Sequence, residues 1–364
     1  GTYQATAKTT RTLYRALSIS YSTYKTMKKK NIIHFIFLIF LVVGTIYVIR
    51  NHQTNKLQHS EGNIFGTVFS IEYEYKTALD SAILEKLNEV DSTLSMFNKQ
   101  SIVSKINSGE SDSTDLMFRN VFRLAQNVAE DTDGAYDITV APLVNAWGFG
   151  FKNGEDVSAQ KIDSIKTFVG YKNVTLEGTK LKKADRRTML DFSSVAKGYA
   201  LDCIASLFDS LNIKNYLIMI GGEVVVKGMH PEGRPWKIGI SRPTADMNTE
   251  SQTALSISNI AMATSGNYLR YYEKNGKRYA HTIDPISGHP VQHDLLSATV
   301  FAPTCAQADA YATAFMVMGM ERAKSILRKH PEMLAHFIYT NAQGDYEVWM
   351  SEKLKKHVVK TTEP

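Results

Sequence analysis

The spacing of apolar residues along the chain predicts a series of amphipathic helices. In residues 78–94 the apolar side chains recur three and four positions apart, from Ile83 to Leu94, and this is the period of one helix face. The same spacing predicts further helices over residues 115–132, 157–169, 196–211, 306–318 and 321–329, with a short helix near the end of residues 95–107.

Segments rich in β-branched and aromatic residues lie between these helices and predict strands. They cover residues 63–75, 173–181, 188–192, 216–220, 223–228, 236–240, 254–257, 261–264, 277–283, 297–302, 335–339 and 345–350. Several of these predicted strands follow one another with no helix between them, which disfavours a doubly wound parallel sheet. We therefore predict an α+β fold with mixed or antiparallel sheets and packed helices.

The first 50 residues follow a different pattern. Residues 1–26 are rich in Ser, Thr, Tyr, Lys and Arg without an apolar period, so we expect them to be disordered. Three lysines at 28–30 then precede a largely apolar run over 32–49, close to the length of about 20 residues that spans a bilayer as a helix. This arrangement predicts an uncleaved signal anchor, one transmembrane helix over residues 27–50.

The charges that flank this helix predict its orientation. Lysines at the end of an apolar helix stay in the cytoplasm, so we expect the body of the protein on the outer side of the membrane. Met27 is the expected start of translation, with residues 1–26 as an upstream extension. Residues 51–60 are predicted to be a polar linker, residues 61–351 one domain, and residues 352–364 a polar tail.

The formal net charge of +6 comes from the N-terminal part of the chain. Of the 42 Lys and Arg residues, nine lie in residues 1–60, which contain no Asp or Glu. The rest of the chain has more acidic than basic residues, and this disfavours a nucleic-acid-binding body. The two cysteines, Cys203 and Cys305, form no C-x-x-C motif, so we predict neither a disulfide framework nor a zinc site.

Residues 190–202, with the sequence LDFSSVAKGYALD, combine acids, two hydroxyls and a lysine around the start of a predicted helix. Acidic and hydroxyl side chains at such a position cap the free N–H groups of the helix. The helix N-terminus also attracts anions, and Lys197 adds a mobile positive charge. Two interpretations stay open here: an ordinary capped helix with a surface lysine, or an anion-binding site.

Asp309 and Thr313 lie four residues apart, and therefore on one face of the predicted helix over 306–318. A carboxylate and a hydroxyl among small residues leave room for a hard cation such as Mg²⁺, which uses few protein oxygens. The alternative is a first-turn acid and a core hydroxyl. Likewise, His281 is either a structural strand histidine or a general base, and residues 134–150 are either a buried hairpin or the wall of a site for a planar ligand.

Taken together, these segments resemble the FAD:protein FMN transferase family, often called ApbE. The resemblance covers roughly residues 62–350 and depends on eight short motifs that occur in the order typical of the family. They are Gly66-Thr67, Ser95-x-Phe97 with Ser104-x-x-Asn107, residues 136–149, residues 191–199, residues 220–223, Ala263-Thr264-Ser265-Gly266, residues 281–288, and Ala308-Asp309-Ala310-x-Ala312-Thr313.

The resemblance implies a T-fold-like α+β core and a transferase that cleaves FAD, attaches FMN to a Thr or Ser of a target flavoprotein, and releases AMP. It implies Mg²⁺, or alternatively Mn²⁺, held by Ser194, Asp309 and Thr313, with His281 as the base. The residues that it implies for FAD binding are Phe65, Phe97, Ala135, Tyr136, Asp137, Asp191, Lys197 and Ile283.

The resemblance further implies a place in the bacterial inner membrane, with the catalytic domain on the periplasmic side. The acceptors would be flavoprotein subunits of membrane electron-transfer complexes. Three positions depart from the family pattern: Phe65 replaces a common Met, Ala141 replaces a common Gly, and Thr45 stands where many members have a lipidated Cys. Two other functions stay open, a metal-dependent FAD pyrophosphatase and a flavin-binding protein without turnover.

Overall fold

An eight-stranded antiparallel sheet lies at the centre of the body, in strand order β1-β2-β5-β6-β9-β12-β13-β14. The computed structural model describes residues 20, 30–47, 55–149, 157–241, 251–267, 271–274 and 277–359. The sheet confirms the predicted α+β class with antiparallel pairing. Its strands are β1 (Lys56–Ile64), β2 (Thr67–Tyr75), β5 (Tyr216–Ile220), β6 (Glu223–Lys227), β9 (Ile260–Gly266), β12 (Leu295–Ala302), β13 (Leu334–Thr340) and β14 (Tyr346–Met350).

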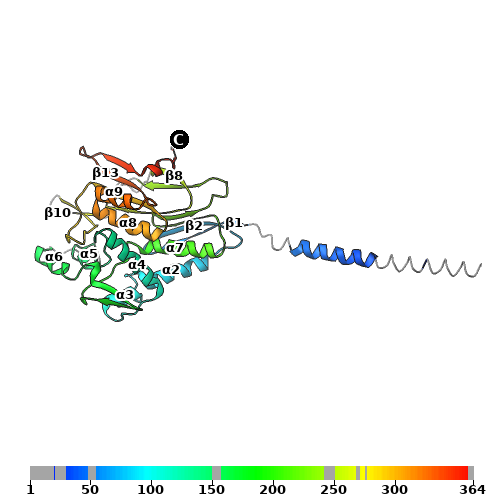
Figure 1. Ribbon diagram of the computed structural model, residues 1–364, viewed down its shortest axis with the longest axis horizontal. Coiled ribbons are helices and arrows are strands. Elements are labelled where there is room, and N and C mark those ends of the chain that lie inside the picture. Colours follow the sequence, from blue (N-terminus) through cyan, green and yellow to red (C-terminus); the bar gives the residue numbers. More distant parts are fainter. Residues whose placement is uncertain are drawn as a thin grey trace, which may run out of the picture. The chain divides into compact units, whose positions relative to one another are not determined.

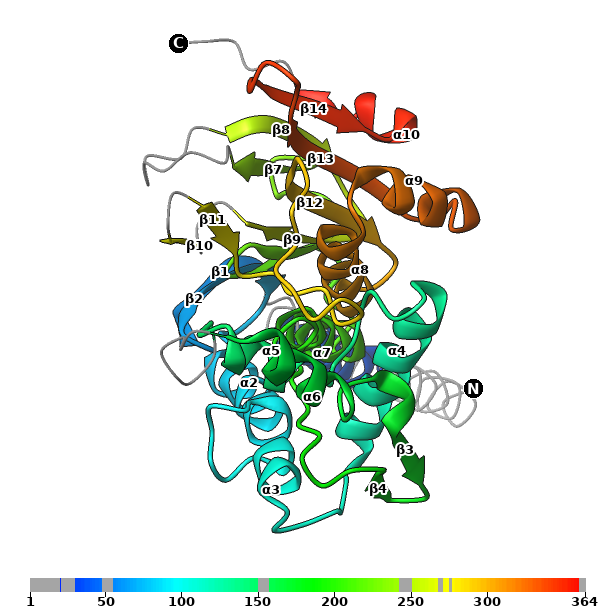
Figure 2. The same cartoon turned by 90° about the vertical axis from the view of Figure 1, so that its left-hand side faces the viewer.

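Helices cover one face of this sheet (Figures 1 and 2). Helices α7 and α8 pack directly on the central strands, and α2 and α4 pack on α7 and α8 from outside. One large hydrophobic core joins these two layers to the sheet. The helices are α2 (Asp80–Leu94), α3 (Ile102–Ser108), α4 (Leu116–Asp131), α5 (Ala141–Ala146), α6 (Ala159–Lys166), α7 (Ala196–Ser210), α8 (Cys305–Met318), α9 (Met320–Lys329) and α10 (Glu352–Lys355).

A smaller sheet covers the opposite face, in the order β15-β8-β7. Its strands are β7 (Trp236–Ser241), β8 (Ser251–Ile257) and β15 (Val358–Val359). Because side chains alternate across a strand, Val224 and Val226 of β6 enter the core beneath this small sheet, whereas Val225 enters the core under the helices. Burial on both faces explains why residues 224–226 are three consecutive valines.

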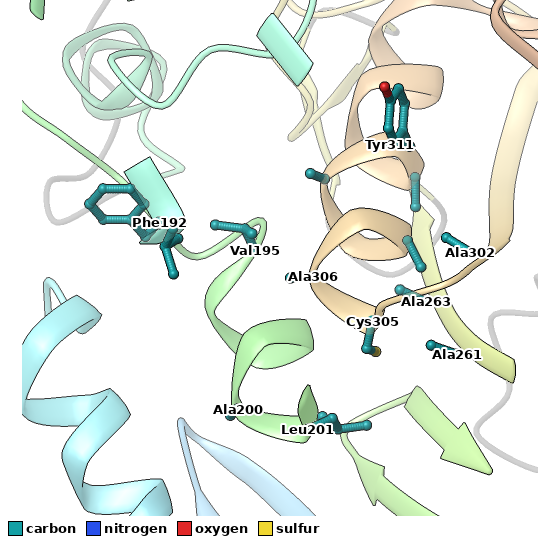
Figure 3. Close-up of a cluster of buried hydrophobic side chains, with 14 of the residues drawn as sticks. Phe192, Val195, Ala200, Leu201, Ala261, Ala263, Ala302, Cys305, Ala306 and Tyr311 are labelled. Atoms are coloured by element: carbon teal, nitrogen blue, oxygen red, sulfur yellow. The ribbon is translucent and has the colours of Figure 1, made fainter. Parts of the chain in front are cut away.

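Helix α8 is buried on nearly every side, because alanine dominates its sequence. Small side chains let it lie between α7, β9 and β12 at short distances. Figure 3 shows α8 beside α7, with Cys305 and Ala306 at its start and Ala261 and Ala263 on the neighbouring strand. The closeness of α7 and α8 determines the geometry of the candidate site.

Several predicted strands differ in the structure. Residues 63–75 include the turn of Phe65 and Gly66 between β1 and β2, so only Thr67–Tyr75 forms one strand. Residues 173–181 are not one strand, because a turn with Gly178 at φ 62° separates β3 (Val174–Glu177) from β4 (Lys180–Lys183). Residues 188–192 form no strand beyond a single bridge at Met189. The Leu190 backbone instead bonds the Asn107 side chain, through N–H and C=O contacts of 2.8 Å each. A side chain therefore replaces the expected neighbouring strand.

The predicted linker and tail also contain regular structure. Strand β1 begins at Lys56, so residues 56–60 of the predicted linker belong to the sheet, while residues 51–54 lie outside the described part. In the predicted tail, α10 buries Leu354 completely under the small sheet, and β15 pairs with β8. Both ends of the domain are thus held by packing and pairing, and residues 360–364 lie outside the described residues.

The N-terminal segment forms a separate unit, Gly1–Asn55. Residues Lys30–Tyr47 form one helix whose length and composition suffice to cross a membrane. A signal sequence near an N-terminus has the same properties, so the helix is a candidate anchor and no more. Apart from residue 20, the predicted extension over 1–26 lies outside the described residues.

Candidate active site

The site is built where the start of α7 meets the first turns of α8. The backbone N–H of Gly198 donates to Asp309 Oδ2 at 3.1 Å. A Cβ atom at position 198 would lie 2.4 Å from the Cys305 carbonyl oxygen. Only glycine permits this approach, because such a contact is far shorter than any normal carbon–oxygen separation. Gly198 therefore brings the Asp309 carboxylate to the N-terminus of α7.

Three charged groups gather beside this contact. Burial raises the pKa of Asp309, while the positive charge of Lys197 and the Gly198 amide act in the opposite direction. Burial alone would lower the pKa of Lys197, but the charges of Asp309 and Glu223 outweigh it and raise the pKa to about 12. Lys197 Nζ forms an ion pair with Glu223 Oε1, and the Glu223 side chain is only 3% exposed. The lysine therefore stays protonated.

Glu223 lies in the motif over residues 220–223 but is not among the predicted site residues. Burial raises its pKa to about 7, and the positive charge of Lys197 opposes the shift. Its second oxygen, Oε2, is buried and has no hydrogen-bond partner in the structure. The signal in the sequence is an acid directly after a glycine turn. Its partner, Lys197, lies on another element and is visible only in the fold.

Ser194 and Thr313 belong to the same two segments as the Gly198–Asp309 contact. Ser194, two residues before α7, donates from Oγ to the Tyr136 hydroxyl at 3.1 Å. Thr313 lies one turn beyond Asp309 on α8, and its Oγ1 is 3.1 Å from Ser265 Oγ on β9. Tyr136 is buried, which raises its pKa, and the nearby charge of Asp309 adds to the shift. The motifs around Ser194, Tyr136 and Asp309 thus converge.

The oxygen groups that the resemblance implies as metal ligands are of the chemical type that a hard cation prefers. Asp309 supplies a carboxylate, and Ser194 and Thr313 supply hydroxyls, which suit Mg²⁺ or Mn²⁺ better than a soft metal. Within the described residues, no group of three or more His, Cys, Asp or Glu side chains is arranged to hold a metal. A cation here would therefore keep most of its coordination sites for water or phosphate oxygens.

Asp137 and Asp191 shape the loops around the cluster. Asp137 Oδ1 accepts from the Thr139 N–H and hydroxyl, and Oδ2 from the Tyr171 N–H, each at 2.7 Å. Burial raises the Asp137 pKa to about 6 in spite of these bonds. Asp191 Oδ1 accepts from the Ser193 N–H at 2.8 Å. Both carboxylates thus stabilise backbone turns by accepting hydrogen bonds from nearby N–H groups.

The predicted flavin-contacting residues fall into two groups. Ala135, Tyr136 and Ile283 are buried, whereas the Phe97 side chain is 74% exposed. Phe65 lies in the turn between β1 and β2, with φ 53°, and packs partly against the main core. The hydrogen bond from Ser194 Oγ joins Tyr136 to the cluster at the start of α7. Residues 134–146 form turns and α5 rather than the alternative hairpin.

His281 follows β11 (Lys277–Ala280), which pairs with β10 (Tyr271–Lys274). Its ring centroid lies 6.4 Å from that of Phe149, in an edge-to-face arrangement. The turn after His281 is tied to the same segment, since Trp147 Nε1 donates to the Gly288 carbonyl oxygen at 2.8 Å. The loop that carries His281 and the aromatic segment 147–149 therefore form one wall.

Comparison with known proteins gives a consistent result. A sequence model of the ApbE family matches residues 65–338. The FAD:protein FMN transferase of Escherichia coli K12 is 35% identical over 313 residues, covering 82% of this chain and 88% of that protein. The protein of the same name from Haemophilus influenzae is 34% identical over 322 residues, covering 84% of this chain and 92% of that one.

Solved structures resemble the fold as well. The flavin transferase ApbE of Vibrio cholerae superposes with a TM-score of 0.74 at 32% identity, covering 83% of this chain and 99% of that one. The apo flavinyl transferase ApbE of Pseudomonas stutzeri gives a TM-score of 0.75 at 29% identity, covering 84% and 97%.

Proposed function

The chain belongs to the ApbE family, and from this premise we propose that it is an FAD:protein FMN transferase. It cleaves the pyrophosphate of FAD and joins FMN through a phosphoester to a Thr or Ser hydroxyl of an acceptor protein. AMP is the other product. The observation that carries this proposal is the cluster of Lys197, Asp309, Ser194 and Thr313 around the α7–α8 contact.

The hydroxyls of Ser194 and Thr313 and the carboxylate of Asp309 would hold a divalent cation, Mg²⁺ or Mn²⁺. When bound, the cation offsets negative charge on the pyrophosphate oxygens as phosphorus is transferred. Lys197 adds a second positive charge, because the nearby carboxylates of Asp309 and Glu223 keep its amino group protonated. The N-terminus of α7 adds backbone N–H groups that favour the same anion.

His281 accepts the proton of the acceptor hydroxyl. As its imidazole takes this proton, the acceptor oxygen bonds to the FMN phosphorus, and the phosphorus–oxygen bond to AMP breaks. AMP leaves as an anion whose charge Lys197 helps to offset. A neutral hydroxyl is a weak nucleophile, so the rate depends on this proton transfer.

The aromatic and apolar residues provide the wall for the flavin. Tyr136, Ala135 and Ile283 are buried and fixed, while Phe97 presents an exposed ring. A planar tricyclic ring binds well to such surfaces, because aromatic faces stack and exclude water. The FAD-binding roles of Asp137 and Asp191 would be indirect, since their carboxylates hold the loops in shape.

We further propose that the helix Lys30–Tyr47 anchors the enzyme in the bacterial inner membrane with the T-fold-like domain on the periplasmic side. The acceptors would then be flavoprotein subunits of membrane electron-transfer complexes. Cell fractionation followed by N-terminal sequencing tests the anchor. Protein in the membrane fraction that retains residues 30–47 supports it, and a soluble mature protein that starts near residues 45–60 contradicts it.

The activity is tested by incubating the protein with FAD, Mg²⁺ and a Thr-containing acceptor domain, followed by mass spectrometry of the acceptor. We expect an adduct of the mass of FMN, and none on an acceptor whose Thr is replaced by Val. Free FMN and AMP without an adduct would instead indicate a hydrolase. FAD that stays intact would indicate a flavin-binding protein without turnover.

A further inference from the structure

Asp202 on α7 caps the start of α8. Its Oδ1 accepts from the backbone N–H of Cys305 at 2.8 Å, and its Oδ2 from that of Ala306 at 2.9 Å. These donors have no partner inside their own helix, because the first N–H groups of a helix are always free. A carboxylate at this position also interacts favourably with the helix dipole.

The opposite contact repeats the arrangement with the helices exchanged. Asp309 of α8 accepts from the N–H of Gly198 in the first turn of α7, at 3.1 Å. Each helix therefore caps the other, through carboxylates at positions 202 and 309. Gly198 and Asp202 are one turn apart on the same face of α7, so two contacts fix both the distance and the sliding of α8 along α7.

We propose that Asp202 is a positioning residue that sets the register of α8 against α7. This register determines where Asp309 and Thr313 lie relative to Ser194 and Lys197, and so determines the shape of the cation and pyrophosphate site. The inference depends on the proposed function of that site. Asp202 itself would touch neither substrate nor cation.

An ordinary helix cap does not explain Asp202. Helix α8 already has its own cap, since Thr304 Oγ1 accepts from the Gln307 N–H at 3.3 Å. Helix α7 has no side-chain cap at its own N-cap residue, Val195, and Asp309 supplies that contact from outside. A local cap stabilises only its own helix. The two carboxylates instead hold α7 and α8 in one position relative to each other, and these helices carry different proposed ligands.

The test compares Asp202→Asn with two matched caps that do not link α7 to α8. Thr304→Ala removes the local cap of the same helix. Asp115→Asn weakens the cap of α4, where Asp115 Oδ1 accepts from the Phe118 N–H at 2.6 Å. Hydrogen exchange and Mn²⁺ binding by calorimetry are measured on the whole protein, at a temperature where every variant is folded.

In Asp202→Asn we expect faster amide exchange at Cys305 and Ala306, which lose their acceptor. Exchange at Gly198 should also rise by about tenfold, because a shift of α8 moves its acceptor Asp309. Mn²⁺ should bind about tenfold more weakly, the usual scale for residues that orient a ligand. In Thr304→Ala and Asp115→Asn, both Gly198 exchange and Mn²⁺ affinity should stay at wild-type values. Should Asp202→Asn not fold, Asp202→Glu keeps the charge but changes its reach, and we expect the same weakening of Mn²⁺ binding.

Faster exchange confined to Cys305 and Ala306, with Gly198 exchange and Mn²⁺ affinity as in the wild type, would overturn the proposal. The exchange at Gly198 requires neither FAD nor an acceptor. An absence of FMN adduct with the wild-type protein would therefore count against the proposed function only. Hydrogen exchange at Gly198 would still decide whether Asp202 sets the register of α8.

Discussion

At the phosphate end of the candidate site, Lys197, Gly198 and Asp309 lie on two helices in direct contact, whereas at the flavin end Phe65, Phe97 and His281 lie on turns and loops. Asp309 is 2% exposed and Phe97 74% exposed. The first region has fixed charges that are buried and hydrogen-bonded. The second has aromatic groups near the surface.

This difference matches the demands of the proposed reaction. Charge develops on the same pyrophosphate oxygens in every turnover, and buried groups held in place stabilise it without reorganisation. The flavin and the acceptor must enter and leave, and loops allow such movement. We therefore expect substitutions at the helical end to weaken stabilisation of the developing charge, and substitutions at the loop end to remove the base or to weaken flavin binding.

The largest effect is expected for Asp309→Ala. Loss of the carboxylate removes the only charged cation ligand in the proposed set, so FMN transfer should fall by at least about 10³-fold. Single-turnover assays with saturating FAD measure this. Asp131→Ala is the control, because Asp131 contacts α8 through the Tyr311 hydroxyl at 3.0 Å but belongs to no proposed ligand set. Full activity of Asp309→Ala would show that the helical end does not carry the chemistry.

A smaller loss is expected for His281→Ala. Without a base for the acceptor hydroxyl, the transfer rate should fall by about 10²-fold, while FAD binding stays nearly unchanged. His289→Ala, in the exposed turn of the same loop, is the control. Equal losses in both variants would point to disruption of the loop.

Phe97→Ala should alter binding more than chemistry. Removal of an exposed ring from the flavin wall is expected to raise the KM for FAD about tenfold, the scale of one aromatic contact, and leave kcat and the melting temperature close to wild type. Leu116→Ala removes a similarly exposed side chain, 63% exposed at the start of α4, and serves as control. A lower kcat with unchanged KM would contradict the division between the two ends.

A separate effect concerns stability rather than activity, at the loop that carries Asp137. Because the pKa of Asp137 is raised from 3.8 to about 6 by burial, the folded protein binds this proton more tightly than the unfolded chain. Its contribution to stability is therefore complete below about pH 4 and is lost as the pH rises through 6, by up to about 3 kcal/mol.

Urea unfolding of the wild type and Asp137→Asn, from pH 5 to pH 8, measures this contribution. The wild type should lose stability relative to the variant over this interval, because only the wild type has a carboxyl group at this position to ionise. A constant difference between the two proteins would show that Asp137 has an ordinary pKa.

The sequence predicts the two helices of the helical end because their signals are local. The Ser194–Lys197 motif, the four-residue spacing of Asp309 and Thr313, and the Ala-rich helix are all contained in short segments. The partners of these residues were not predictable in the same way. Glu223 meets Lys197 from another element, and Asp202 caps a helix more than 100 residues away.

The errors at the domain ends have a similar cause. Strand β1 lies at an edge of the sheet, and its residues are exposed or half-buried except for the buried Ser60. It therefore lacks the apolar pattern that marks a central strand. Leu354 is one buried residue in a polar segment. Leu354 is buried only because distant segments pair to form the small sheet. The residues next to it in the sequence therefore do not predict its burial.

The most direct test of the account is the anomalous diffraction of Mn²⁺ in a crystal that also contains FAD. We predict one ion at the α7–α8 contact, about 2.1 Å from an Asp309 carboxylate oxygen, with Ser194 and Thr313 as further ligands and the pyrophosphate beside Lys197. An ion bound elsewhere, or a pyrophosphate remote from Lys197 and Asp309, would contradict the central claim that these two helices carry the chemistry.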